Sequence, residues 1–500
     1  MSNIRVTHSG LIAFLVGIIG VITGIIFTII ITRRITPEEL GLWTLIGSLI
    51  SYVVIIEPII SYWTTRQIAR GEKVARTSIG TSGLFSIGGF AGFYLIAIMV
   101  SDSLSVDPFP IILASTLIPI TFINNTLSGI ALSHYPQSVS YSIVSFESSK
   151  LPIGFGLVYI LELGLIGAII ATILSSIIKT IILIIFTRKE LTGEIKKHVI
   201  KFWLRLSWIP LYSNGTGLIF TLDVLVYSLL TNSLIGLAYW GVANGVSNIV
   251  AHSGLISQAI YPKLLATGKK DFAEKNLERM MYFAIPMSFG LILFAKPALY
   301  ILNPIYSDGV IIVYFLTLRV FSNILLNNFF NILVAYENID LNKNASLKQF
   351  IKSKLFFIPS LNYIMNGSYV IGLILFLNFS KNSGLSEVNL IVGWSIICLS
   401  VTIPFLFYGI FKVRKEYQIS FRLKSILKYV ISSVISYMIL FFVLEHSLVY
   451  YESIFDFLPQ LIPLILLAGL IYFGLTFLID KSTRELFSSI INEIRKWQIK

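Results

Sequence analysis

The sequence predicts an all-α integral membrane protein with about fourteen transmembrane helices, arranged as two six-helix lobes plus two C-terminal helices, with both termini cytoplasmic. Three observations support this fold class. Of the 500 residues, 55% are hydrophobic and only 13% are charged, whereas a soluble chain carries about 25% charged residues. The mean hydropathy is +0.83. Apolar runs long enough to cross a bilayer recur along the whole chain, and the basic residues gather in alternate loops between them.

Hydropathy over windows of about 20 residues predicts the helices in order. They lie at residues 9–31, 40–62, 79–100, 110–133, 143–162, 164–187, 206–231, 234–261, 280–302, 309–335, 355–379, 387–411, 425–445 and 458–479. The first run is too long for the apolar region of a signal peptide and lacks a small-residue cleavage site, so we interpret it as a retained helix. The fifth and sixth helices are separated only by a tight turn around Glu162 and Gly164.

The positions of Lys and Arg predict the orientation of the helices. Basic clusters follow the second, sixth, eighth, tenth and twelfth helices and the last one, at residues 66–76, 188–205, 263–279, 343–354, 412–428 and 481–500. The opposite loops carry only Arg33, Arg34 and Lys381. Because cytoplasmic loops are enriched in Lys and Arg, both termini are expected in the cytoplasm of a multi-pass protein of the plasma membrane.

A weak internal repeat predicts the domain organisation. Trp43 is followed 28 residues later by Gly71, and Trp240 is followed 28 residues later by Gly268. Each pair flanks a helix of the same predicted orientation, which indicates duplicated halves of six helices. We therefore expect an N-terminal lobe at residues 1–205, a C-terminal lobe at 206–415, and two further helices with a cytoplasmic tail at 416–500.

Several function classes lack their sequence signals. The net charge of +13 comes from short loop clusters and forms no continuous basic stripe, so no nucleic-acid partner is expected. The single cysteine, Cys398, excludes an intramolecular disulfide, and no two histidines have metal-ligand spacing. There is no GxxxxGK[ST] nucleotide-binding loop and no large outer loop that could hold catalytic residues. We expect no enzyme activity, no cofactor and no metal.

The candidate site residues are charges inside the predicted helices. An ionisable group there costs several kcal/mol unless it faces a partner or an aqueous cavity. Asp223 lies in the apolar run of the seventh helix, and its alternative role is to accept hydrogen bonds that lock helix packing. Arg319 suits an anionic phosphate, and its alternative role is to pair with Asp223 or with Glu57, which is a further candidate in the second predicted helix. Glu147 and Lys150, three residues apart, either neutralise each other or straddle the mouth of a cavity.

Amide side chains add polarity to two helices. Asn244 and Asn248 lie in the eighth predicted helix, and Asn327 and Asn331 lie in the tenth. Amides suit the hydroxyl groups of a sugar, and they equally suit packing between helices.

Four segments together resemble the polysaccharide and lipid-linked oligosaccharide flippases of the multidrug/oligosaccharidyl-lipid/polysaccharide exporter superfamily. They are ITRRITPEELGLWTLIGSLIS, RQIARGEK, LDVLVYSLLTNSLIGLAYWGVAN and YPKLLATGKKD. The resemblance implies two lobes around a central cavity that opens alternately to either side. It implies transport of a lipid-linked oligosaccharide, of the polyprenyl-phosphate type, from the cytoplasmic to the outer leaflet, with membrane lipids and glycan-assembly proteins as partners. On this interpretation Asp223 and Arg319 line the cavity or close a gate by pairing.

Two other functions stay open at this point. A multidrug or organic-cation antiporter of the same superfamily places acids in the first helix of a lobe. The first predicted helix contains no acid, but Asp223 lies in the matching helix of the second half. A membrane-embedded sugar transferase needs an outer catalytic loop, which the sequence does not contain.

Overall fold

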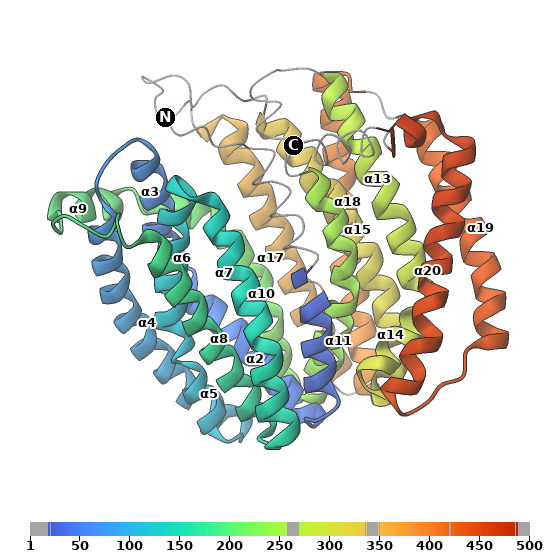
Figure 1. Ribbon diagram of the computed structural model, residues 1–500, viewed down its shortest axis with the longest axis horizontal. Coiled ribbons are helices and arrows are strands. Elements are labelled where there is room, and N and C mark those ends of the chain that lie inside the picture. The colour runs from blue at the N-terminus through green and yellow to red at the C-terminus, as the bar shows by residue number, and fades with distance from the viewer. Residues whose placement is uncertain are drawn as a thin grey trace, which may run out of the picture. The chain divides into compact units, whose positions relative to one another are not determined.

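The computed structural model is built of helices, and no strand occurs among the residues that it describes, which are 19–20, 22–257, 270–335, 337, 349, 351–381, 383–419, 422–485 and 487–488 (Figure 1). The first half contains α2 (Pro37–Val54), α3 (Pro58–Ala69), α4 (Ala75–Leu104), α5 (Pro108–Ala114), α6 (Leu117–His134), α7 (Pro136–Gly154), the π-helix η1 (Phe155–Ile160), α8 (Gly164–Thr187), α9 (Lys197–Arg205), α10 (Trp208–Thr231) and α11 (Ile235–Ser247). The second half contains the 3-10 helix η2 (Asn248–Ser257), α13 (Lys270–Leu293), α14 (Ala295–Leu302), η3 (Pro304–Gly309), α15 (Val310–Ala335), α17 (Lys354–Ser380), α18 (Glu387–Tyr417), α19 (Leu423–Ser447) and α20 (Ile454–Ile479). The predicted all-α class is confirmed.

Most predicted membrane spans correspond to observed helices. Within the described residues, ten helices are long and apolar enough to cross a membrane, and the number rises to twelve if each of two bent pairs is one span. The predicted spans 9–31 and 234–261 lie partly outside the described residues; their described parts are a short apolar helix, Ile22–Thr32, and the pair α11 and η2. The total of fourteen and the cytoplasmic termini stay predictions.

Two spans predicted as continuous helices are broken. The span predicted at 40–62 consists of α2 and α3, which meet at 58°, and the span predicted at 280–302 consists of α13 and α14, which meet at 67°. Proline explains both breaks, because it has no N–H to donate to the carbonyl four residues earlier. Pro58 leaves the carbonyl of Val54 without its helical donor, and α2 ends at Val54. Pro297 does the same to Leu293, where α13 ends.

Contacts divide the chain into two compact units. The first consists of Met1–Gly241 and Asn366–Glu387, and the second of Val242–Met365 and Val388–Lys500. In unit 1 a cluster of buried side chains joins α3, α6 and α9. In unit 2 a second cluster joins α13, α15 and α18. A division into compact units does not test whether the chain contains an internal duplication. The lobes predicted at 1–205, 206–415 and 416–500 therefore stay a prediction.

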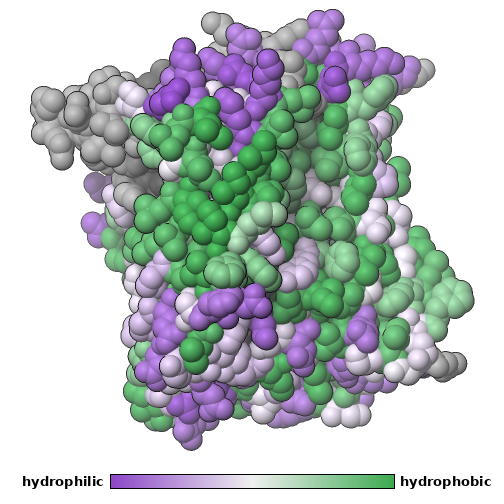
Figure 2. All heavy atoms as spheres, turned by 90° about the vertical axis from the view of Figure 1, so that its right-hand side faces the viewer, coloured by the Kyte–Doolittle hydropathy of each residue, from purple (hydrophilic) through white to green (hydrophobic). Residues whose placement is uncertain are grey.

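The face that carries α19 and α20 exposes many apolar side chains. Figure 2 shows a hydrophobic band on this face between two hydrophilic margins. Large apolar side chains of both helices are exposed, including Met438 and Phe442 of α19 and Leu466 and Leu470 of α20. An apolar band of this kind is stable in contact with lipid and unstable in water.

Candidate functional site

Asp223 lies in α10 and is 2% exposed. The hydroxyl of Tyr369 in α17 donates a hydrogen bond to its Oδ2 at 2.7 Å, and the backbone N–H of Val224 donates to its Oδ1, also at 2.7 Å. Bonds of this length to a carboxylate are short and strong. Asp223 thus accepts a hydrogen bond from a neighbouring helix, which fits either predicted role, and its role in a cavity stays a prediction.

Two further contacts hold α10 beside its neighbours in unit 1. The side-chain amide of Asn366 donates to the carbonyl of Thr216 at 2.6 Å, and the hydroxyl of Tyr52 in α2 donates to the carbonyl of Thr221 at 2.5 Å. The ring of Tyr369 also stacks on Phe220, with centroids 5.3 Å apart. Asn366 and Tyr369 are three residues apart in α17, so both point from one helix face toward α10.

Glu57 lies at the break between α2 and α3 and is also 2% exposed. The hydroxyl of Ser61 donates to its Oε2 at 3.0 Å, the amide of Asn125 donates to the same oxygen at 3.4 Å, and the hydroxyl of Thr126 donates to Oε1 at 3.4 Å. Asn125 and Thr126 belong to α6. All three donors are neutral.

Glu147 and Lys150 form an ion pair in α7, with Nζ and Oε2 3.3 Å apart. Thr23 donates to the same Oε2 at 3.1 Å, and the ammonium of Lys150 lies over the ring of Phe27 at 4.7 Å from its centroid. Their side chains are 16% and 13% exposed. The two side chains are close enough to neutralise each other, and whether they lie at the mouth of a cavity stays a prediction.

Arg319 begins a polar row along α15 in unit 2. Arg319 is 9% exposed, Asn323 is half-buried, and Asn327 and Asn331 are exposed. These four residues follow one another at intervals of four, so they lie along one side of the helix. A row that begins with a guanidinium and continues with amides offers donors to a polar, anionic ligand.

The other two predicted asparagines lie at the junction of α11 and η2. Asn244 is half-buried in α11, and Asn248 is exposed at the start of η2. The change from α-helix to 3-10 helix at Asn248 shifts the side-chain directions by tightening the turn. η2 packs against α15, where the hydroxyl of Ser247 donates to the carbonyl of Val313 at 3.4 Å.

The predicted site residues belong to two groups. Glu57, Glu147, Lys150 and Asp223 belong to unit 1, and Asn244, Asn248, Arg319, Asn327 and Asn331 belong to unit 2. A pairing of Arg319 with Asp223 or Glu57 involves both units and stays a prediction, as does the role of each residue in a cavity.

The residues that donate hydrogen bonds to Asp223 and Glu57 were not among the predicted site residues. Tyr369, the donor to Asp223, lies 146 residues away in an apolar helix and has no local signal. Asn125 and Thr126 do have a local signal in the sequence, because the run Asn124–Asn125–Thr126 interrupts an otherwise apolar span. Asn323 was detectable from its interval of four residues to Arg319 and Asn327.

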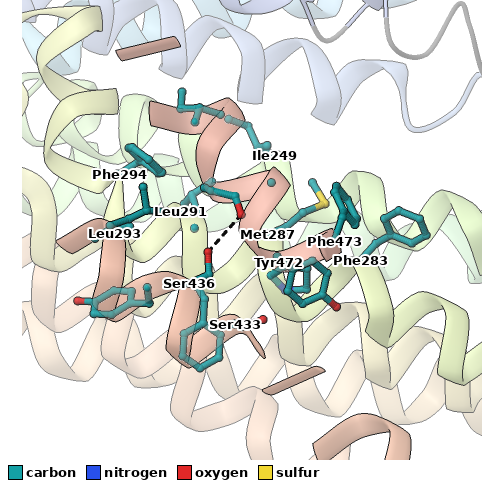
Figure 3. Close-up of a pocket in the computed structure, with 18 of the residues that line it drawn as sticks. Ile249, Phe283, Met287, Leu291, Leu293, Phe294, Ser433, Ser436, Tyr472 and Phe473 are labelled. Carbon is teal, nitrogen blue, oxygen red and sulfur yellow. Dashed lines mark hydrogen bonds between the residues drawn. The ribbon is translucent and has the colours of Figure 1, made fainter. Parts of the chain in front are cut away.

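A separate cavity of about 350 Å³ lies within unit 2, between α13, α14, α19 and α20 (Figure 3). Its walls are almost wholly apolar and include Met287, Phe294, Tyr472 and Phe473. The hydroxyl of Ser436 points into the same region and donates to the carbonyl of Ala468 at 3.2 Å, drawn as the dashed line in Figure 3. Apolar walls favour a hydrocarbon group over a polar one.

No cluster of three or more His, Cys, Asp or Glu side chains with the geometry of a metal site occurs in the part of the chain that the structure describes. Glu57 accepts hydrogen bonds from hydroxyl and amide groups, Asp223 accepts one from a tyrosine hydroxyl, and Glu147 pairs with an ammonium group. The arrangement therefore offers binding and charge neutralisation.

No family model and no curated protein matches the chain. Among solved structures, the chain is similar to an inward-facing multidrug resistance MATE family transporter of the MOP superfamily, with a TM-score of 0.57 and 13% identity over 82% of this chain and 99% of that chain. It is also similar to a mutant MATE transporter of Vibrio cholerae, with a TM-score of 0.52 and 13% identity over 82% of this chain and 98% of that chain. The chain is thus a multi-pass membrane protein with the MATE transporter fold.

Proposed function

We propose that this protein is a plasma-membrane transporter that works by alternating access and exchanges an organic cation for a small inorganic cation. The fold supports a transporter, because the two similar structures are MATE transporters and one is described as conferring multidrug resistance. They favour the antiporter over the lipid-linked oligosaccharide flippase among the alternatives that the sequence left open.

The observation that carries the antiporter proposal is the buried acid at Asp223. Its carboxylate is held inside the membrane by hydrogen bonds from the hydroxyl of Tyr369 and the N–H of Val224. A carboxylate fixed at that depth attracts cations, and an intramembrane acid is a functional site by default. An antiporter needs such a group, because a fixed negative charge offsets the cost of bringing a cation into the membrane.

The flippase remains a second candidate because two observations favour it. The first transporter matches 82% of this chain, so about a fifth of the chain has no counterpart there, although 99% of that transporter is covered. The apolar cavity of about 350 Å³ against α19 and α20 also suits a hydrocarbon chain. In this case the polar row from Arg319 to Asn331 would hold the sugar phosphate, and polyprenyl-linked sugar would be the substrate.

The test uses purified protein in liposomes loaded with a fluorescent organic cation. If the antiporter proposal is correct, an opposing proton or sodium gradient drives the dye against its own gradient, and Asp223→Asn slows this movement at least tenfold. Liposomes with Asn378→Ala serve as the matched control, because Asn378 is exposed and bonds only to its own helix at the carbonyl of Ile374.

The flippase proposal predicts a different experimental result. If dye movement is the same with and without a gradient, the antiporter proposal is wrong. A gene deletion that traps polyprenyl-linked sugars in the cytoplasmic leaflet and removes surface glycan would then establish the flippase.

A further inference from the structure

Glu57 is a carboxylate, 2% exposed, whose setting the proposed transport does not use. It lies where Pro58 ends the helical hydrogen bonding of α2, inside a bent span. The backbone there makes tight turns, with the N–H of Glu57 bonded to the carbonyl of Val54 at 2.9 Å. Broken helices with irregular backbone recur at the ion sites of membrane transporters, because they expose oxygen atoms within the bilayer.

The close approach of α3 and α6 brings the partners of Glu57 together. Gly129 of α6 faces α3, and a Cβ atom there would lie 2.8 Å from the Oγ1 of Thr65 and 3.3 Å from the carbonyl oxygen of Ser61. Ser133, one turn further, donates to the carbonyl of Thr65 at 3.0 Å. Glycine therefore permits the separation at which Asn125 and Thr126 reach the Glu57 carboxylate.

The charge of Glu57 is poorly compensated by these partners. Among the described residues no Lys or Arg acts on it, and its three donors are the neutral side chains of Ser61, Asn125 and Thr126. Two of the three bonds are 3.4 Å long, near the weak limit for a hydrogen bond. Glu147 in the same unit is different, since Lys150 lies 3.3 Å from it. Burying a carboxylate without a charged partner is costly, and a bound cation or proton removes that cost.

The side chains around Glu57 offer oxygen atoms to such a cation. The set comprises both carboxylate oxygens, the hydroxyl oxygens of Ser61 and Thr126, and the amide oxygen of Asn125, which faces the site when the amide is turned over. Hard cations prefer oxygen ligands. The distances of 3.0–3.4 Å between these groups and the carboxylate suit neighbouring ligands around one small ion.

We propose that Glu57, Ser61, Asn125 and Thr126 form a binding site for one small hard cation, a proton or a sodium ion, at the break between α2 and α3. The cation would neutralise Glu57 and let it stay buried. This site would supply the exchanged inorganic cation, a use that rests on the proposed antiport. Binding itself does not depend on transport, and the test therefore measures binding alone.

The experiment uses the purified full-length protein in lipid nanodiscs. For a proton, infrared spectroscopy at neutral pH records the carbonyl band of protonated carboxyl groups. For sodium, the thermal unfolding midpoint is measured above pH 8 in sodium chloride and in N-methylglucamine chloride at equal concentration. Each measurement is made on the wild type, on Glu57→Gln and on Glu147→Gln, which removes an intramembrane acid that already has a cationic partner.

A proton site predicts a carboxyl band in the wild type that is lost in Glu57→Gln and kept in Glu147→Gln. A sodium site predicts a midpoint several degrees higher in sodium, an effect lost in Glu57→Gln, weakened in Thr126→Val and kept in Glu147→Gln. Glutamine retains the shape and hydrogen bonding of a neutral Glu57, so this variant is expected to fold.

The inference is overturned if the wild type shows neither a carboxyl band nor a response to sodium, or if folded Glu57→Gln retains the wild-type signal. If Glu57→Gln does not fold, Thr126→Val decides: an unchanged sodium response and an unchanged carboxyl band frequency overturn the site. A cation bound at Glu57 without any gradient-driven dye movement would leave the site standing and refute the antiport, so the two failures are distinguishable.

Discussion

At the scale of single residues, the intramembrane acids differ in what faces them. Glu147 pairs with the ammonium of Lys150, Asp223 accepts a short bond from the hydroxyl of Tyr369, and Glu57 accepts longer bonds from three neutral side chains. Since the cost of burying a carboxylate depends on its partners, these three groups have different tasks despite the same chemistry. Glu147 is neutralised within the protein, whereas Asp223 and Glu57 are the two acids for which we propose a cation.

Tyr369→Phe tests the contact to Asp223. It removes one hydroxyl from a bond of 2.7 Å and leaves the ring that stacks on Phe220. A hydrogen bond to a charged group contributes about 1.5–3 kcal/mol. We expect the protein to insert and fold, with gradient-driven transport lowered at least tenfold in the liposome assay.

Tyr94→Phe is the control, because it makes the same chemical change in unit 1 at an exposed position of α4. Equal transport by Tyr369→Phe and the wild type would show that the Tyr369 hydroxyl only supports packing.

At the scale of elements, proline and glycine decide how the spans pack. Proline breaks two spans at the residue four positions before it, at Val54 and Leu293. Glycine permits close helix contacts within unit 1. A Cβ atom at Gly41 of α2 would lie 1.9 Å from the carbonyl oxygen of Leu234, just before α11. Small residues at such contacts are a general device of membrane helices, because they let backbones approach each other.

Gly41→Val is expected to destabilise the protein strongly, because a side chain there meets backbone that cannot rotate away. Overpacking of this kind costs about 1–3 kcal/mol or more. The measurement is the thermal unfolding midpoint in detergent. Gly47→Val is the matched control in the same helix, since a Cβ atom at Gly47 meets nothing within 4 Å. Similar midpoints for the two variants would contradict the close contact.

At the scale of the whole molecule, α13, α19 and α20 of unit 2 are joined at one end by a polar cluster. It consists of Glu278, Arg422, Lys428, Tyr429, Asp480 and Thr483, and we call it the Asp480 cluster. Lys428 lies 3.1 Å from Asp480, Arg422 lies 3.0 Å from Glu278, and the hydroxyl of Tyr429 reaches Asp480 at 3.3 Å and Glu278 at 3.5 Å. These bonds connect the two C-terminal helices to the rest of the unit.

The Asp480 cluster predicts a pH dependence of stability. Burial raises the pKa of Asp480, but hydrogen bonds from Lys428 and Thr483 outweigh it, and the net pKa lies below the ordinary value of 3.8. A carboxyl whose pKa is lower in the folded state stabilises that state above its unfolded pKa, and this contribution is lost as the pH falls through the folded pKa.

Asp480→Asn should therefore lower the free energy of unfolding by about 1–3 kcal/mol at neutral pH, because the charged bonds from Lys428 and Thr483 are weakened. The difference in free energy of unfolding between the variant and the wild type should stay constant down to about pH 5 and become smaller below pH 4. Unfolding midpoints across this range provide the measurement. Asp456→Asn is the control, since Asp456 lies at the other end of α20. A difference that does not change with pH would exclude this linkage.

Hydropathy alone predicted the membrane class and most of the spans, because a run of about 20 apolar residues has to satisfy its backbone hydrogen bonds as a helix in lipid. The predicted helix 164–187 is α8 to the residue, and 206–231 differs from α10 by two residues. It also singled out Asp223 and Glu57, because a charge among apolar residues is visible without any partner.

The residues that face Asp223 and Glu57 became visible in the tertiary structure. The donor to Asp223 comes from a helix 146 residues away, and the donors to Glu57 come partly from α6, 68 and 69 residues away. Hydropathy measures the cost of placing a residue in lipid and carries no information on which distant residue will face it. The bend at Pro58 and the close approach at Gly129 placed a carboxylate among oxygen atoms, and they converted a candidate charge into a candidate cation site.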